Sequence, residues 1–207
     1  MKKIVLVVFL LAVCAATGRT QESRQDISVS GVGMIFPFVA SSTNVQVHSN
    51  YALGGLVSYR FMLTPNSAVE ANYGITYQNT FRFVVGNTNV VKVLTRTQEM
   101  SGAYVRTFTF RKFNPFVEAG PTGLIFLPIR NSGTTSIDAK QQTEIGGMYG
   151  AGIAYEISPG FDIRAEYRGL VTKVPNFGQA NSVNGYNFTT NRWFNMFEPT
   201  VGVAYHF

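Results

Sequence analysis

The 207-residue sequence has few cysteines, histidines and charged residues. Its single cysteine, Cys14, lies near the N-terminus, so the rest of the chain has no thiol for a disulfide or a cysteine-based metal site. Only His48 and His206 supply imidazole groups. Charged residues make up 14% of the chain, and no run of Lys and Arg is interleaved with aromatics as nucleic-acid binding would favour. We therefore expect no metal, no cofactor and no nucleic-acid partner.

Long apolar runs are also missing. The longest, from Ile4 to Ala16, follows Lys2 and Lys3 and precedes Gly18. A helix needs about 20 apolar residues to span a bilayer, so this run is too short and a helical membrane protein is excluded. A short apolar run between basic and small residues is typical of a secretory signal peptide cut near Gly18. The chain then divides into a signal peptide, a short N-terminal lead and one folded domain: residues 1–18, 19–25 and 26–207.

The N-terminal segment leaves lipidation of Cys14 open as an alternative. The run from Leu11 to Cys14 is similar to a lipoprotein processing site, although Val13 stands where a small residue is usual. Removal of Lys2 and Lys3 with the signal peptide takes the formal net charge from +6 to +4. A mild positive excess suits contact with anionic lipid or polysaccharide, and it equally suits a merely solvated surface.

The rest of the sequence alternates between apolar and other residues with a period of two, most clearly from Met148 to Lys173. One face of this predicted hairpin is apolar, and the other carries all of its charge except the final Lys173. Because paired strands must match face to face, an odd loop centred on Pro159 is required. The predicted pairs are Glu156 with Asp162, Ala154 with Arg164, Gly152 with Glu166, and Gly150 with Arg168. In the last three pairs a small residue thus faces a long ionic one, as a narrow barrel interior requires.

The same pattern over the whole chain predicts an all-β fold, an eight-stranded antiparallel up-and-down transmembrane β-barrel. Connections alternate between long and short, which puts both termini on the side of the short turns, and in an exported chain that side is the periplasm. The apolar faces point outward, the reverse of a soluble barrel. From Tyr51 to Phe61, ten steps of about 3.3 Å at a tilt near 40° give a height of about 25 Å, which matches a lipid-facing band. The expected aromatic girdles contain Tyr51, Tyr77, Tyr149 and Trp193 on the outer side, and Tyr59, Phe61, Tyr155 and Phe161 on the periplasmic side.

Four details of the strands are also predicted. The first strand, from Asp26 to Phe38, is interrupted at Gly31-Val32-Gly33, which predicts a bulge. A polar loop follows over residues 41–49. The hairpin around residues 81–94 is longer than a membrane span requires, so it should stand beyond the barrel. Pro121 and Pro199 lack a ladder donor inside strands, so we expect local bulges there.

The strongest constellation of charges is predicted to point into the barrel. Its members are Arg60, Glu70, Glu118, Glu156, Arg164, Glu166, Arg168 and Glu198. Turn parity sets Arg60 opposite Glu70, whereas Arg164 and Arg168 need partners from across the barrel, with Glu70, Glu118 and Glu198 as the leading candidates. Because ions withdrawn from water must be paired, the favoured interpretation is a plug of salt bridges. A narrow ion path or proton relay is the alternative.

Two stretches resemble a known family, the small outer-membrane β-barrel proteins of the OmpX and OmpA type. They are the hairpin from Tyr149 to Gly169 and the closing strand from Glu198 to Phe207. The resemblance covers the mature chain and implies insertion by the outer-membrane assembly machinery, with Tyr205 and Phe207 in the C-terminal assembly signal. It does not imply one activity, because family members include adhesins, structural proteins and a few lipid-modifying enzymes.

Three functions follow as hypotheses. The first is a non-enzymatic barrel that contacts outer-membrane lipid and lipopolysaccharide as a monomer and uses its loops at the surface, where the 81–94 hairpin could add a strand to an extracellular partner. The second is a low-conductance pore. The third is a lipid A-modifying hydrolase, for which His48 with Ser49 or Ser41 could imitate a catalytic pair, although no carboxylate lies nearby in the sequence. The glycines 147, 150 and 152 have the spacing of a dinucleotide-binding loop, but no helix follows them, which excludes that site.

Overall fold

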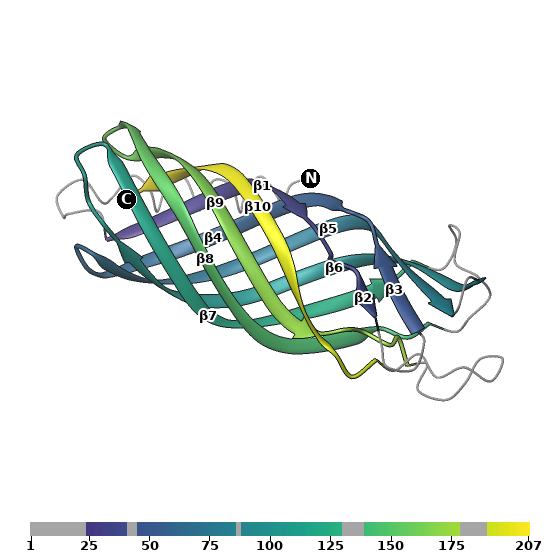
Figure 1. Ribbon diagram of the computed structural model, residues 1–207. Coiled ribbons are helices and arrows are strands. Elements are labelled where there is room, and N and C mark those ends of the chain that lie inside the picture. The colour runs from purple at the N-terminus through teal and green to yellow at the C-terminus, as the bar shows by residue number, and fades with distance from the viewer. Residues whose placement is uncertain (1–23, 41–44, 86–87, 130–138, 179–189) are drawn as a thin grey trace, which may run out of the picture.

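The computed structural model describes residues 24–40, 45–85, 88–129, 139–178 and 190–207, which form strands joined by turns and connections (Figure 1). The predicted signal peptide and most of the predicted lead lie outside the described residues. Within them no helix is long and apolar enough to cross a membrane. The strands are β1 Gln25–Met34, β2 Val39–Ala40, β3 Val45–Ser49, β4 Ala52–Thr64, β5 Ser67–Val85, β6 Thr88–Thr107, β7 Phe113–Pro128, β8 Gln142–Ser158, β9 Phe161–Lys173 and β10 Trp193–His206.

Eight of these strands close into a barrel. Around the wall, each strand from β4 to β9 pairs antiparallel with the next one in the chain. Strand β1 pairs with both β10 and β4, which closes the circle. Strands β2 and β3 stand outside the circle and extend the sheet beside β5. The predicted eight-stranded antiparallel up-and-down barrel is confirmed.

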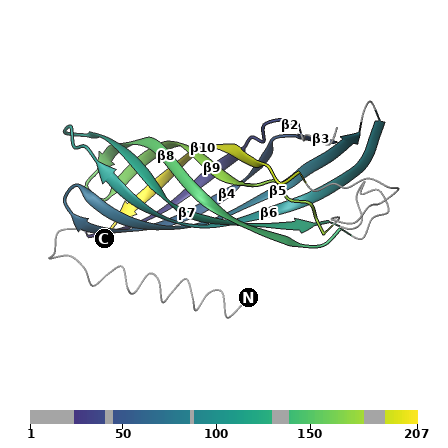
Figure 2. The ribbon, with the colours of Figure 1, turned by 60° about the horizontal axis from the view of Figure 1, so that its bottom comes forward.

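The two ends of the barrel differ in their connections. We call the end with the short turns, at residues 65–66, 108–112 and 159–160, the turn end; it also holds the C-terminus (Figure 1). The opposite end, which we call the loop end, carries β2, β3 and the protruding tips of β5 and β6 (Figure 2). The described parts of the connections after β7 and β9, at residues 139–141, 174–178 and 190–192, also lie there.

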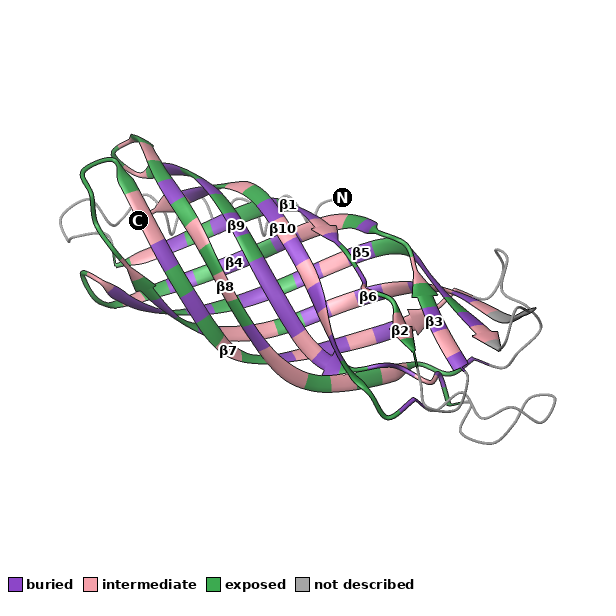
Figure 3. Cartoon of the chain, in the orientation of Figure 1, coloured by how far each residue is buried: buried purple, intermediate pink, exposed green. Residues whose placement is uncertain are grey.

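Alternation of side chains between two faces explains why these residues form a barrel wall. Along β4 the inward residues Ser58 and Arg60 are buried, whereas the outward residues Val57 and Tyr59 are exposed. The same bands of buried and exposed residues cross the other strands (Figure 3). Because successive side chains point to opposite faces of a strand, one register shift would exchange the two faces, and the sequence pattern therefore fixes the pairing.

The hairpin of β8 and β9 has the predicted pairs, all four of them. The predicted odd loop centred on Pro159 is wrong, because Ser158 pairs directly with Phe161 around a two-residue turn. A register shift between Glu156 and Ser158 restores the parity. The strand therefore absorbs the extra residue as a bulge, and Gly160, with a φ of 104°, closes the turn in a conformation that suits glycine.

The long hairpin of β5 and β6 also agrees with the prediction. These strands contain 19 and 20 residues, against 13 in β4, and their tips continue past the barrel wall. The predicted polar loop over residues 41–49 is wrong for its second half, because Val45 to Ser49 form β3 and pair with β5 from Val85 to Phe81. Buried Val45 and Val47 supply the apolar face of this short strand. Residues 41–44 lie outside the described residues.

The predicted bulge at Gly31 to Gly33 is wrong. Strand β1 pairs with β4 without a shift from Gln25 opposite Phe61 to Met34 opposite Ala52. The two glycines take outward positions and Val32 takes the inward one, so no extra residue is needed to keep the alternation.

The predicted bulges at the prolines are also wrong. Beside Pro199 the pairing of β1 with β10 stops after Val32 opposite Thr200 and resumes in the same register at Ile35 opposite Phe197. This register sets Pro199 opposite Gly33, and a Cβ on that glycine would lie 3.7 Å from the proline ring. Beside Pro121 the pairing of β6 with β7 is interrupted in the same way, with Gly102 opposite the proline. Each proline therefore interrupts the backbone hydrogen bonds between two strands locally, and the glycine opposite it leaves room for its ring.

Candidate functional site: the barrel interior

The interior near the turn end is held by two buried ion pairs. Arg60 on β4 donates from Nε to Glu70 Oε2 on β5 at 2.7 Å, and these two residues are also paired across the strands, as predicted. The guanidinium of Arg60 lies 4.7 Å from the ring centre of Phe116. Arg164 on β9 donates to both oxygens of Asp26 on β1, at 2.9 and 2.7 Å. Both pairs are almost fully buried, so each charge depends on its partner.

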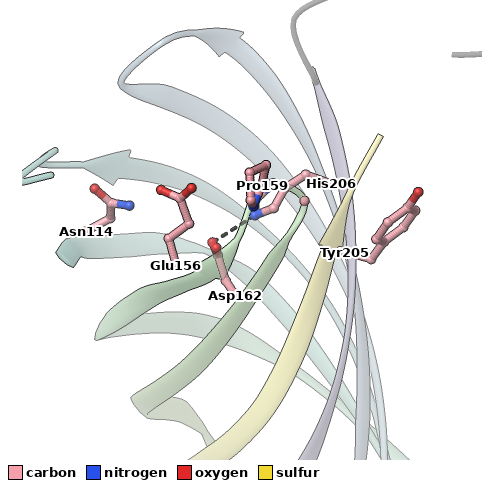
Figure 4. Close-up of a pocket in the computed structure, with 7 residues that line it drawn as sticks. Asn114, Glu156, Pro159, Asp162, Tyr205 and His206 are labelled. Carbon is pink, nitrogen blue, oxygen red and sulfur yellow. Dashed lines mark hydrogen bonds and ion pairs between the residues drawn. The ribbon is translucent and has the colours of Figure 1, made fainter. Parts of the chain in front are cut away.

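A histidine continues the second pair to the mouth of the barrel. His206, one residue from the C-terminus, lies with Nε2 2.8 Å from Asp162 Oδ2 and with Nδ1 3.8 Å from Asp26 Oδ2. These residues come from β10, β9 and β1, so the two contacts of His206 connect three neighbouring strands where β10 and β1 close the barrel. Figure 4 shows the histidine and Asp162 facing one another at the rim of a cavity of about 780 Å³, with Glu156 on the next strand.

Arg168 forms the centre of the ionic interior. Its guanidinium lies 2.5 Å from Glu99 Oε1, 3.4 Å from Glu198 Oε2 and 3.5 Å from Glu118 Oε1. These carboxylates come from β6, β10 and β7, so one arginine on β9 connects strands around the barrel. Ser101 supports the arrangement, because its hydroxyl donates to Glu99 at 2.7 Å and accepts from Arg168 at 3.0 Å.

Glycine on β8 makes room for these groups. A Cβ on Gly150 would lie 2.6 Å from an oxygen of Glu118 and 3.2 Å from the side chain of Arg168, so no other residue fits there without displacing them. Arg168 is opposite this glycine on the neighbouring strand, as predicted from turn parity. The glycine therefore serves the packing of the ionic interior.

The described interior contains more acid than base. Seven carboxyl groups are buried against three arginines, an excess of four. Both oxygens of Glu118, and one each of Glu99 and Glu198, have no hydrogen-bond partner among the described residues. Buried carboxylates without full compensation attract protons, water or cations. The buried carboxyl groups belong to Asp26, Glu70, Glu99, Glu118, Asp162, Glu166 and Glu198.

Toward the loop end the interior changes from ionic to apolar. Phe36, Phe81, Phe126, Phe177 and Phe194 are all buried there, and their rings meet at centroid distances of 5.4 to 6.4 Å. Buried Thr97 and Thr172 pair with Phe126 and Phe194 of this cluster. Several further buried side chains of the interior are apolar or sulfur-containing. They are Met34, Leu124, Met148, Leu170 and Met196. A polar solute crossing the barrel would therefore meet two barriers of opposite character.

Sequence comparison decides which family this barrel represents. A family model described as the outer membrane protein beta-barrel domain matches residues 5–207. The chain belongs to this family. It is therefore a bacterial outer-membrane barrel, and the exposed apolar band on its outer face is the surface that contacts lipid.

Solved structures of other outer-membrane barrels share the fold. Neisserial surface protein A is 13% identical, with 89% of this chain and 98% of that chain covered and a TM-score of 0.59. OprG from Pseudomonas aeruginosa is 12% identical, with 90% and 97% covered and a TM-score of 0.60. Ail, the attachment invasion locus protein of Yersinia pestis, is 13% identical, with 90% and 100% covered and a TM-score of 0.51. No curated protein is significantly similar in sequence. At these identities the likeness concerns the fold alone.

The predicted interior residues of this outer-membrane barrel occupy different levels. Glu156 lies at the rim of the turn-end cavity and is only half buried, so it does not join the ionic interior. Glu166 points inward near Thr200, whose hydroxyl donates to it at 3.4 Å. The other six predicted members take part in the buried ion pairs described above: Arg60, Glu70, Glu118, Arg164, Arg168 and Glu198.

Sequence analysis missed two partners of the interior arginines, Asp26 and Glu99. For Arg164 none of the three expected partners is correct, because Asp26 takes that place. For Arg168 the expected Glu118 and Glu198 are joined by Glu99, which makes the shortest contact. Asp26 alternates with apolar Ile27 and Val29 in β1, so its inward direction was available as a signal. No signal in the sequence indicated its pairing with Arg164, which lies 138 positions away.

The predicted girdle residues of the outer-membrane barrel point outward. Exposed fractions range from 41% for Tyr59 and Phe61 to 73% for Tyr51, as lipid contact requires. One member has a further contact: the ring of Tyr149 covers Gly169 on the neighbouring strand, and its hydroxyl accepts from Asn195 Nδ2 at 2.6 Å. The remaining members are Tyr77, Tyr155, Phe161 and Trp193, all exposed.

The residues considered for a hydrolase do not form a catalytic pair. The ring of His48 lies 4.7 Å from that of Phe38, whereas the hydroxyl of Ser49 donates to Asn79 Oδ1 at 2.7 Å. Neighbouring residues of β3 point to opposite faces, which separates the two side chains. Ser41 lies outside the described residues. Among the described residues no group of three or more His, Cys, Asp or Glu side chains could hold a metal ion.

Proposed function

We propose that this protein is a non-enzymatic outer-membrane barrel whose interior is closed and whose loop end makes contacts at the cell surface. The observation that carries the proposal is the filling of the interior. Three buried arginines tie carboxylates from β1, β5, β6, β7 and β10 near the turn end, and a cluster of phenylalanines fills the loop end. An eight-stranded barrel is just wide enough for side chains to fill it, so the two layers leave little room for a solute.

The proposal includes an orientation. An exported chain inserted by the assembly machinery should hold its turn end and both termini in the periplasm and its loop end outside the cell. There β5 and β6 extend beyond the other strands, with β3 already paired to β5 over residues 81–85. A partner that adds a strand would therefore meet β2 or the far edge of β6, and lipopolysaccharide would surround the wall below. The name of the Yersinia relative, an attachment protein, supports a role in surface contact.

Thiol labelling of intact cells tests the orientation. The mature chain is expected to have no cysteine, so single replacements give clean signals. Asn50→Cys at the loop end should react with a membrane-impermeant reagent on intact cells, whereas Asn66→Cys at the turn end should react only after the outer membrane is permeabilised. The reverse pattern would overturn the orientation.

Conductance in planar bilayers tests the closed interior. We expect the folded protein to give almost no current, with folding checked by the mobility shift of unboiled samples on gels. A low-conductance pore is the second candidate, favoured by the excess of four buried carboxylates, and it predicts a steady cation-selective current. Mass spectrometry of lipid A from cells with and without the protein tests the hydrolase alternative, for which we expect identical spectra.

A further inference from the structure

Phe177 has an unusual backbone for a large buried residue. Its φ is 51°, in the left-handed region, and Gly178 follows with a φ of 76°. Three other non-glycine residues of the described chain have positive φ, namely Gln78, Arg111 and Asn191, and all three have exposed side chains. A bulky residue in this conformation raises the free energy of the backbone, so it persists only where other contacts offset the strain.

The contacts that offset the strain are made by the ring. Phe177 has no exposed surface and meets Phe81 at 5.4 Å, Phe83 at 6.3 Å and Phe126 at 6.4 Å between ring centres, each in an edge-to-face arrangement. The three partners stand on β5 and β7, which are parts of the barrel wall. Phe177 instead comes from the connection between β9 and β10, so it is a loop residue inserted among wall residues at the loop end.

The side chain of Gln142 binds the backbone of this connection beside the ring. Gln142, the first residue of β8, accepts with Oε1 from the backbone N–H of Asn176 at 2.8 Å and from that of Phe177 at 2.7 Å. Its Nε2 donates to Glu144, which orients the amide. The N–H of Lys140 also donates to the carbonyl of Phe177 at 2.9 Å. Gln142 therefore binds both backbone N–H groups at the base of the inserted ring.

We propose that Phe177 is a displaceable stopper of the loop-end mouth and that Gln142 is the positioning residue that holds it closed. When the ring leaves its position among the phenylalanines, the strain at φ 51° is released, and this release lowers the free-energy cost of opening. The base of the connection stays fixed, because the N–H of Val174 donates to the carbonyl of Arg192 at 3.0 Å. The mouth then opens through residues 175–178 while the wall keeps its pairing. This inference rests on the proposed function, since a stopper matters only in a barrel with a closed interior.

A thiol reporter under the stopper tests the proposal in the folded protein in lipid vesicles. Thr97 is a suitable site because it is 1% exposed, pairs with Phe126 and has a hydroxyl without a hydrogen-bond partner. In the Thr97→Cys background, a cationic methanethiosulfonate reagent added from the loop side should react slowly. Adding Gln142→Met should raise the rate about tenfold, equivalent to 1.4 kcal/mol, because two hydrogen bonds are lost. Adding Phe177→Ala should raise it at least as much.

The matched control exchanges the two side chains of the tether. Gln142→Glu combined with Glu144→Gln keeps an acceptor for both N–H groups and a donor beside it, so the reaction rate should stay within about twofold of the reference. Unchanged rates in Gln142→Met and Phe177→Ala, with normal gel mobility, would overturn the stopper. So would an exchange variant that reacts as fast as Gln142→Met. Failure of the proposed function would show separately, as a steady current through the protein without substitutions.

Discussion

The three buried arginines of the barrel differ in how many carboxylates depend on them. Arg60 and Arg164 each serve one carboxylate, whereas Arg168 lies within ion-pair distance of three. Removing an arginine therefore leaves one uncompensated acid in the first two cases and three in the last. Arg164 is the simplest of the three to study, because its two hydrogen bonds go to the two oxygens of one residue, Asp26.

Replacement of Arg164 by Met should lower the free energy of unfolding by about 3–5 kcal/mol, because it strands the carboxylate of Asp26 in the interior. Urea unfolding in lipid vesicles measures this loss. The double variant Asp26→Leu with Arg164→Met should recover most of it, since a buried pair can be replaced by apolar side chains at little cost. Equal stability of the single variant and the unchanged protein would show that water or His206 compensates Asp26 instead.

The direction of these side chains could be predicted from the sequence, but their partners could be predicted only within hairpins. The two strands of a hairpin must match face to face, so the sequence predicts Arg60 opposite Glu70 and Glu166 opposite Gly152, and in both hairpins a register shift beside the turn preserves these pairs. Asp26 and Glu99 reach their arginines across the barrel. Their levels depend on the stagger accumulated over several strands, and alternation in one strand carries no information on that stagger.

At the scale of elements, the last strand closes the barrel wall and ends in the aromatic residues of the predicted assembly signal. Strand β10 closes the wall against β1, and the N–H of Phe207 beyond it donates to the carbonyl of Gln25 at 2.9 Å. The ring of Phe207 stacks on that of Tyr205 at 6.1 Å between centres and is partly exposed. The folded protein thus gains one hydrogen bond and one exposed ring contact from Phe207, a modest contribution.

Deletion of Phe207 should therefore reduce assembly far more than stability. The alternating aromatic terminus is similar to the signal that the assembly machinery recognises in this family, whereas the folded structure loses only the contacts named above. The measurement pairs the amount of protein in the outer membrane with urea unfolding of refolded protein. Phe113→Ala is a matched control, because it removes another exposed aromatic at the turn end outside the last strand. Normal outer-membrane levels of the truncated chain would count against the prediction.

The elements that sequence analysis missed share a physical cause. Strand β3 is short and surrounded by polar residues, so two valines at alternate positions were too few to distinguish it from a loop. The sequence predicts bulges at Pro121 and Pro199 because a closed wall has no free edge. In the structure each faces a glycine, and the ladder is interrupted without an inserted residue. In both cases the structure depends on residues of a neighbouring strand, and these contacts override the local preference of the sequence.

At the scale of the whole molecule, the barrel is sealed twice. Near the turn end the seal is ionic and centred on Arg168; near the loop end it is apolar and includes Phe81 and Phe126. Two barriers in series close a path even when one is removed. The ionic layer is unfavourable for apolar solutes, whereas the phenylalanine rings offer an ion no hydrogen-bonding group, and the buried hydroxyls beside them, such as that of Thr97, carry no charge.

Opening the barrel should therefore require changes in both layers. Arg168→Ala alone, and Phe81→Ala with Phe126→Ala alone, should each give almost no current in planar bilayers. The triple variant should conduct, and its current should be carried by cations, because seven buried carboxyl groups would then face two remaining arginines. Unboiled samples on gels confirm that each variant is folded, and Val203→Ala, which shortens an outward apolar side chain, controls for general loosening of the wall. A current through Arg168→Ala alone would mean that the phenylalanine layer is permeable and that the ionic layer is the only seal.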